Sequence, residues 1–166
     1  MINLKISIIA FSLIVLPFFS KAQGSVNHNI TANDMKTDFF IESESKFNFE
    51  QTVENFKNIA ENKTWKITAI HDLQHTMKTH GKDVLPVKVF AICHPKHSSK
   101  ILEKDDERII SSLMPCRLSI YNKSDGKTYM SRMNSIIMAQ LFEGIIKEVM
   151  TDAGMELEEM IKELNK

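Results

Sequence analysis

Two apolar segments that each carry one cysteine constrain the fold more than any other feature of the sequence. Residues 87–93 (VKVFAIC) and 116–121 (CRLSIY) are rich in β-branched and aromatic residues, and they predict two strands. Side chains alternate along a strand, so each cysteine should share a face with apolar neighbours: Val87, Val89 and Ala91 for Cys93, and Leu118 and Ile120 for Cys116. We therefore expect both thiols to point into apolar surroundings beneath helices.

The relative direction of these two strands decides whether the cysteines meet. Cys93 ends the first strand and Cys116 begins the second, so antiparallel neighbours would bring them together. A parallel crossover would instead place them a strand length apart, and the sequence leaves both arrangements open. If the cysteines meet, three roles are open: a structural disulfide, a redox-active pair, or two ligands of a metal or haem site.

The N-terminal residues 1–22 predict a signal peptide. Lys5 precedes an apolar run over 6–19, and Ala22 ends a small-residue cleavage motif. The run is shorter than the about 20 residues that span a bilayer, so no stable membrane insertion is expected after cleavage. Residues 23–36 predict a flexible spacer, and 37–166 a single domain. We therefore expect a periplasmic or secreted protein, in a compartment where cysteines can oxidise.

The charge balance argues against a nucleic-acid partner. The chain has 21 Lys and Arg residues against 21 Asp and Glu residues, so no excess positive charge would attract phosphates. With 43% hydrophobic residues among 166, the chain is long and apolar enough to bury a core.

Hydrophobic periodicity predicts alternating strands and helices along the chain. Strands are predicted at 38–43, 65–71, 87–93, 116–121 and 128–132. Helices are predicted from 49 to 60, as a short helix or ordered loop at 72–81, as helical turns over 98–113, as one long helix from 135 to 149, and, after an interruption at 152–154, over 156–164. This order predicts an α+β fold with a single, mostly antiparallel sheet and helices packed on one face.

Two local sequence signals predict the start of one helix and the position of one turn. Asn48 and Gln51, three residues apart, predict a capped start for the first helix. Asp125 followed by Gly126 predicts the turn of a β-hairpin between the last two strands.

Several motifs together resemble the family known as domain of unknown function 302. They are the first helix, 70–74 (IHDLQ), 81–83 (GKD), 92–95 (ICHP), 114–121 (MPCRLSIY) and 125–129 (DGKTY). The resemblance spans about residues 38–150. It implies a compact, single-sheet α+β domain that can pair as a homodimer, with no established activity, and it places this chain in an exported, cysteine-containing subgroup. Many relatives have Asn where this chain has His94.

The cysteines and two histidines form the candidate metal site. His94 follows Cys93 directly, and His71 ends the predicted second strand, so a site at the sheet end would combine Cys93, Cys116, His94 and His71. Sulfur and imidazole donors suit copper, zinc or a haem axial position.

Other side chains that resemble ligands have ordinary structural explanations. His75, His80 and His97 are expected on exposed loops. Met114, Met130, Met133 and Met138 are expected to fill the core, and Glu156, Glu158 and Glu159 to form a solvated helix face.

The sequence therefore predicts an exported binding or accessory domain with a cysteine-centred site for a metal or small redox ligand. One alternative is a thiol-disulfide oxidoreductase, although the chain lacks the Cys-x-x-Cys motif of many such enzymes. Another is a structural homodimer that buries the apolar stripe of the Ile137 or the Leu157 helix. Its Cys93–Cys116 disulfide would add about 3 kcal/mol of stability. The sequence contains no Gly-rich phosphate loop, Gly-x-Ser-x-Gly elbow or His-Glu-x-x-His motif.

Overall fold

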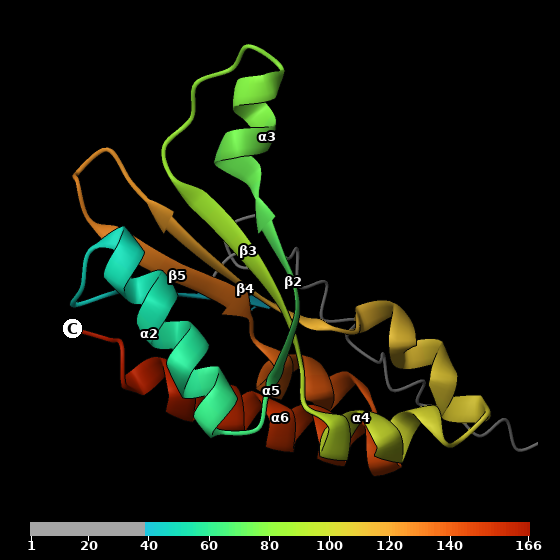
Figure 1. The fold of residues 1–166 in the computed structure, drawn as a ribbon. Helices are drawn as coiled ribbons and strands as arrows, with labels where there is room; N and C mark the ends of the chain where they lie inside the picture. The colour runs from blue at the N-terminus through green and yellow to red at the C-terminus, as the bar shows by residue number, and fades with distance from the viewer. Residues whose placement is uncertain (1–38) are drawn as a thin grey trace, which may run out of the picture.

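A five-stranded antiparallel sheet forms the centre of the molecule (Figure 1). The structure is a computed structural model that describes residues 39–166, so the predicted signal peptide and spacer lie outside the described residues. The strand order is β1-β5-β4-β3-β2, and every neighbouring pair is antiparallel. The strands are β1 (Phe40–Glu44), β2 (Lys66–Asp72), β3 (Val87–Cys93), β4 (Cys116–Asn122) and β5 (Thr128–Met133).

Helices follow the strands in the order that the sequence predicts for an α+β fold, and this prediction is confirmed. The α-helices are α2 (Phe49–Asn62), α3 (Leu73–Thr79), α4 (Pro95–Leu102), α5 (Ser135–Met138) and α6 (Gly144–Lys162), and the 3₁₀ helices are η1 (Asp106–Leu113) and η2 (Ala139–Leu141). Among the described residues, none of these helices has the length and apolar character that crossing a bilayer requires.

Helix α2 begins at the predicted cap. The Asn48 side chain accepts a hydrogen bond of 2.9 Å from the backbone N–H of Gln51, which satisfies one of the free donors of the first turn. Val53, Phe56 and Ala60 follow at helical spacing and are buried against the sheet. Local capping and the apolar stripe therefore agree on where this helix starts and which side it buries.

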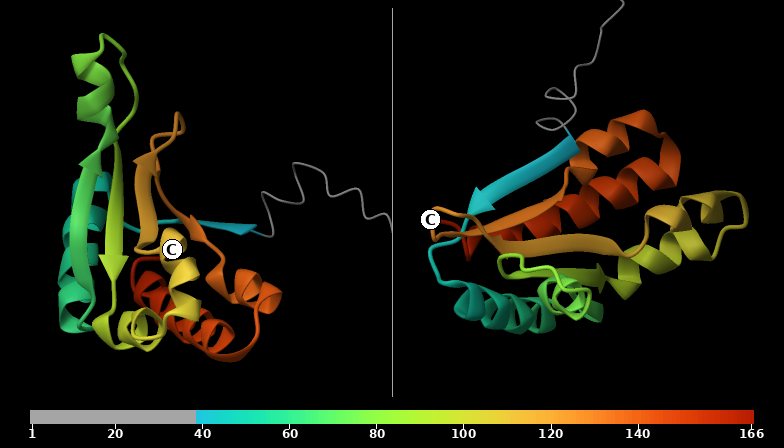
Figure 2. Two further views of the ribbon diagram at one scale, coloured as in Figure 1. Left: turned by 90° about the vertical axis from the view of Figure 1, so that its right-hand side faces the viewer. Right: turned by 90° about the horizontal axis from the view of Figure 1, so that it is seen from above.

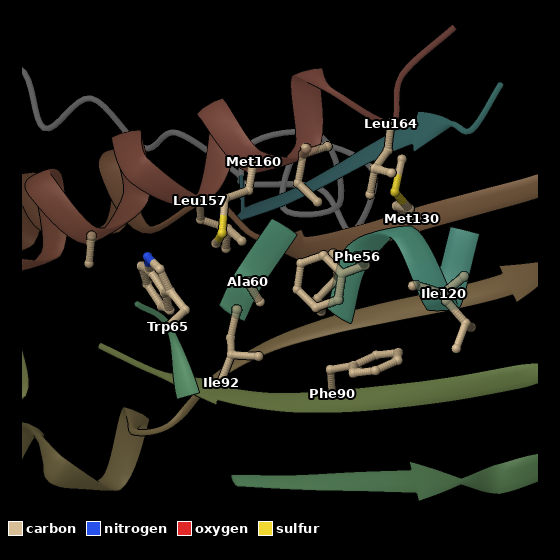
Figure 3. Close-up of a cluster of buried hydrophobic side chains, with 14 of the residues drawn as sticks. Phe56, Ala60, Trp65, Phe90, Ile92, Ile120, Met130, Leu157, Met160 and Leu164 are labelled. Carbon is tan, nitrogen blue, oxygen red and sulfur yellow. The ribbon is translucent and has the colours of Figure 1, made fainter. Parts of the chain in front are cut away.

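The main core lies where α2 and α6 pack on one face of the sheet (Figure 3). Phe56 of α2 meets Phe90 of β3 edge to face, with ring centroids 5.2 Å apart. Such aromatic pairs add to the free energy gained by apolar burial. Trp65 lies at one end of this cluster, near Leu157 of α6, and marks the point where the core passes into the candidate site.

The pairing of β3 with β4 is antiparallel, and it shows that the face of β3 predicted to point into the core is the wrong one. Phe90 pairs with Leu118 and Ile92 with Cys116, so Cys116 lies on the core face, as expected. In β3, however, that face carries Phe90 and Ile92, and not the predicted set of Val87, Val89 and Ala91. Because β3 is apolar on both faces, alternation could not tell which face packs inward. Cys93, the last residue of β3, reaches the buried site from the strand end.

The C-terminal region differs from the prediction of two helices split at 152–154. Helix α6 runs unbroken through these residues, and the chain instead turns at the first residue of α6, Gly144, whose φ is +59°. Gly154 permits close packing of α5 on α6, because a Cβ there would lie 2.6 Å from Ser135 Oγ and 2.8 Å from Ile136 Cγ1. Glycine here serves a close helix contact and does not break the helix.

The C-terminal helix covers its own sheet. Leu157, Met160, Ile161 and Leu164 are buried in the core of the same chain, so the expected dimer contact through the Leu157 helix is wrong. At the end of the strands opposite α3, α4 lies beside α6 (Figure 2). These two helices enclose the candidate site.

Candidate functional site

An apolar cavity of about 90 Å³ lies at the end of β3 and β4 that carries the cysteines. Helices α4, η1 and α6 and the strand ends surround it. Its apolar wall includes Ile101, Ile110 and Val149, which belong to a second buried cluster. Its polar and sulfur-containing side chains include Cys93, Cys116, Met114, Met133, Met150, His94, His97 and Ser98.

Both cysteines line this cavity as free thiols, so no disulfide joins them in this structure. Cys93 Sγ lies 2.8 Å from Ser98 Oγ, and the Ser98 hydroxyl donates to the carbonyl of His94 at 3.1 Å. The single hydroxyl proton of Ser98 is then in use, so the Cys93 thiol is the donor to Ser98. Ser98 thereby ties the cavity end of β3 to the first turn of α4.

The surroundings of the Cys116 thiol shift its pKa. Burial raises its pKa, and the neighbouring Cys93 raises it further, because a second negative charge in the same apolar space is unfavourable. Cys116 is therefore a neutral thiol at neutral pH unless a cation or an oxidant engages it.

Three methionines add thioether sulfur to the same cavity. Met114 precedes the cis peptide bond to Pro115, Met133 ends β5 and Met150 lies on α6. The core role predicted for the methionines holds for Met130, which is fully buried in the main core. Met114 also packs against a buried cluster, and it lines the cavity together with Met133. The cavity lining thus includes five sulfur-containing residues from separate parts of the chain.

Two imidazoles form a polar wall at the side of Trp65. His94 caps the start of α4, and His97 lies three residues on, so the two rings are neighbours, with centroids 4.9 Å apart. His97 Nε2 lies 3.0 Å from Glu156 Oε1 of α6, and His94 Nε2 lies 3.9 Å from the other carboxylate oxygen. His97 is only 4% exposed, so the prediction that it lies on an exposed loop is wrong.

Burial shifts the pKa of two side chains in this wall, His94 and Glu156. It lowers the pKa of His94, although the Glu156 carboxylate acts in the opposite direction. Burial pushes the pKa of Glu156 upward, but the contacts with His97, His94 and Trp65 together bring it below its usual value. Glu156 is therefore a carboxylate at neutral pH, and not part of a purely solvated face.

A surface hollow lies on the outer side of this wall. Trp65, His94 and Glu156 line it together with Lys63, Thr64 and Glu159. Thr64 Oγ1 lies 3.0 Å from His94 Nε2 at this boundary. Trp65 and His94 line both the hollow and the sulfur-lined cavity.

The structure places one of the four predicted metal ligands away from the others. In the β2–β3 pair, Lys66 lies opposite Cys93, whereas His71 lies opposite Val89 and is exposed. His71 is therefore at the other end of the strand, and the predicted combination of His71 with the cysteines is not formed. His75 and His80 are exposed, as expected.

Cys93, Cys116 and His94 do line one cavity. Within residues 39–166, no three or more His, Cys, Asp and Glu side chains already surround a common metal position.

Sequence patterns alone missed His97, Glu156 and the cavity methionines. The spacing of His94 and His97 at the start of a helix, which places both on one face, is a signal that could have joined the two histidines. Glu156 comes from a distant helix, so its contact with them could not be read from spacing. The methionines belong to three elements whose ends meet only in the folded chain.

The family comparison agrees with this architecture. The family model described as "Domain of unknown function DUF302" matches residues 41–164, which include all cavity-lining residues and the sheet except the first residue of β1. The chain belongs to the DUF302 family. A similar solved DUF302 structure is that of an uncharacterized conserved protein from Bacillus stearothermophilus, with 15% sequence identity and a TM-score of 0.68. The alignment covers 76% of this chain and 98% of that one, and at this identity it shows the shared fold. No curated protein matches the sequence of this DUF302 chain.

Proposed function

We propose that this DUF302 chain is an exported binding domain that holds a soft metal ion, Cu(I), in its sulfur-lined cavity. The observation that carries the proposal is that two free cysteines and three methionines line one apolar cavity. Thiolate and thioether sulfur are the donors that favour Cu(I) over harder cations. The leader-like residues 1–22 support export.

The cysteines supply the anionic ligands in this proposal. Binding displaces the thiol protons, and the two thiolates, which would repel each other in the empty cavity, then share a positive charge. A methionine sulfur from Met114, Met133 or Met150 completes a three-coordinate sulfur site. The apolar wall excludes water and hard ligands from the ion. A cavity of about 90 Å³ suits an ion and not a haem, because ligand pockets for larger molecules measure about 300 Å³ or more.

Competition with a chromogenic Cu(I) chelator under reducing, anaerobic conditions tests this proposal. The wild-type chain should withdraw one equivalent of Cu(I) from the chelator. The Cys93→Ala/Cys116→Ala variant should lose affinity by about 100-fold or more, since its anionic ligands are gone. A double variant that competes as well as the wild type would refute the cysteine-centred site.

Two methionine variants refine the same measurement. Met133→Leu keeps the apolar volume but removes a cavity sulfur, whereas Met155→Leu removes an exposed sulfur on α6. Because only the former could reach the ion, Met133→Leu should weaken Cu(I) binding more than Met155→Leu. Circular dichroism of each variant checks that the fold is retained.

Thiol-disulfide exchange is the second candidate function. Cys93 lies one residue before the N-cap of α4, and its Sγ is 2.8 Å from Ser98 Oγ, whose hydroxyl would have to turn away from the His94 carbonyl to donate to a thiolate. In this reaction, Cys93 attacks a small disulfide and releases one thiol, and Cys116 then attacks Cys93, which releases the second thiol and forms the Cys93–Cys116 disulfide. Iodoacetamide should then modify Cys93 faster than a free cysteine at neutral pH. Slow modification of both thiols would exclude this candidate and leave metal binding unaffected.

A further inference from the structure

We propose that the cavity receives Cu(I) from an anionic complex with small thiols, and that the Arg117 guanidinium attracts this complex to the mouth of the cavity, which is formed by residues 113–117. This inference rests on the Cu(I) site of the proposed function and names the form in which the ion arrives. A thiol that carries a carboxylate fits both features of the mouth, since its sulfur suits the cavity and its negative charge suits Arg117.

The cavity meets solvent along the segment that joins η1 to β4. Among the described residues that line it, only Leu113 and Arg117 are exposed, and they flank residues 114–116. Helices α4 and α6 contribute buried residues to the lining, such as Ile101 and Val149. A small molecule therefore reaches the cavity through the mouth, beside Arg117.

The register of the sheet also places Arg117 at this opening. Arg117 lies opposite Ala91, on the face of β4 away from the core, and yet it lines the cavity. Met133 does the same at the end of β5, since the preceding Arg132 is buried on the core face. The cavity therefore extends past the strand ends toward the face opposite the core, where Arg117 and Met133 border it.

Among the residues that line the cavity, Arg117 alone carries a permanent charge. Within residues 39–166 its side chain forms no ion pair, whereas the exposed Arg108 of η1 is paired with Asp105 at 2.8 Å. The two histidines in the lining face the Glu156 carboxylate. An unpaired cation at the mouth of an otherwise uncharged cavity opposes the approach of a free cation and favours the approach of an anion. An anionic complex is therefore the form of Cu(I) that this mouth admits best.

Ligand exchange delivers the ion without a change in its oxidation state. The sulfur atoms of Cys93 and Cys116 replace two carrier thiolates on Cu(I), so two copper–sulfur bonds form and two break. The protons of the two cysteines pass to the departing thiolates, which leave as neutral thiol groups. The raised pKa of Cys116 is then no obstacle, because the carrier accepts the proton that metal binding displaces.

The rate of Cu(I) transfer from two carriers of opposite charge tests the role of Arg117. The Cu(I) complex of glutathione is anionic and that of cysteamine is cationic, and stopped-flow fluorescence of Trp65, the chain's single tryptophan and a cavity residue, follows the transfer. Arg117→Gln should slow transfer from the glutathione complex by about threefold or more, and should not slow transfer from the cysteamine complex. Arg117→Lys, which keeps the charge, should stay within about twofold of the wild type. Arg108→Gln, outside the cavity lining, should transfer at the wild-type rate.

Added salt tests the same attraction in the wild-type chain, without a substitution. Salt should slow transfer from the glutathione complex and not from the cysteamine complex, because it screens the charge of Arg117. Either an Arg117→Gln chain that accepts Cu(I) from glutathione at the wild-type rate, or a wild-type rate that salt leaves unchanged, would overturn this inference alone. A wild-type chain that withdraws no Cu(I) from the chromogenic chelator would instead refute the proposed function on which the inference rests.

Discussion

Single polar residues hold the C-terminal helix to the sheet. The Arg132 side chain is buried on the core face of β5, donates to both carboxylate oxygens of Glu158, through Nε at 2.7 Å and through Nη2, and donates to Ser43 Oγ at 3.0 Å. A buried guanidinium needs such partners, because its charge costs free energy away from water. Glu158 therefore has a structural role, although it was expected on a solvated face.

Replacing Glu158 tests this contact. Glu158→Ala should lower the free energy of unfolding by about 2 kcal/mol or more, less than for a fully buried pair because the Glu158 side chain is 28% exposed. Glu159→Ala is the matched control, since Glu159 forms only an exposed pair with Lys162, worth about 0.5 kcal/mol or less. Urea denaturation measures both, and equal effects would contradict the account.

The protonation of His94 should make stability depend on pH. Its pKa in the folded chain is below the unfolded value of about 6.5, because burial disfavours the imidazolium. The unfolded chain then binds more protons as pH falls below about 6.5, so the free energy of unfolding should decrease toward pH 5. His97 and Lys96 also disfavour the His94 charge, and Glu156 favours it.

Denaturation curves at about pH 7.5 and pH 5 measure this loss. His94→Gln should show a smaller decrease than the wild type, and His75→Gln, at an exposed position, should show the same decrease. Glu156, whose pKa is lowered, adds its own loss only below about pH 4.5. A His94→Gln variant with an unchanged pH profile would show that another group is responsible.

At the level of elements, the close contact between α5 and α6 depends on Gly154. Gly154→Ala should destabilise the chain by about 1–3 kcal/mol, because the new Cβ would meet Ser135 and Ile136 at less than van der Waals distance. Met155→Ala, the next residue and an exposed one, should change stability by about 0.5 kcal/mol or less. Thermal unfolding compares the two, and an unaffected Gly154→Ala protein would mean that α5 can move away freely.

The elements show which parts of the fold the sequence could predict. Asn48 and the spacing of Phe56 and Ala60 predict α2 correctly, because the cap and the buried stripe are local signals. The predicted break at Gly154 is wrong. This glycine allows close contact with α5, which the local sequence does not reveal. The sequence left open whether the two cysteines meet, which the antiparallel register of β3 and β4 decides, and the cavity residues from α6 could not be predicted.

At the scale of the whole molecule, one face of the sheet is only partly covered by the described residues 39–166. Val89, Ser119 and Tyr121 lie on the face opposite the core and are only half-buried. The family resemblance implies a homodimer, and we propose that this face is where two copies meet. Sheet faces with apolar and aromatic residues are suited to such contacts.

Light scattering over a dilution series tests this pairing. The wild-type chain should change from dimer to monomer as it is diluted, and Val89→Lys should remain monomeric throughout, because it places a charge in the centre of the face. Leu85→Lys, at an exposed loop position, should leave the dimer unchanged. A wild-type chain that is monomeric at every concentration would exclude this interface.

The central claim is that the cavity holds a metal ion through sulfur. X-ray absorption at the copper edge of the wild-type chain, loaded with one equivalent of Cu(I), reports the donor atoms directly. We expect a first shell that contains two or three sulfur atoms, because Cys93, Cys116 and three methionines line the cavity. A first shell made of nitrogen or oxygen, with no sulfur, would contradict the assignment of Cys93 and Cys116 as ligands.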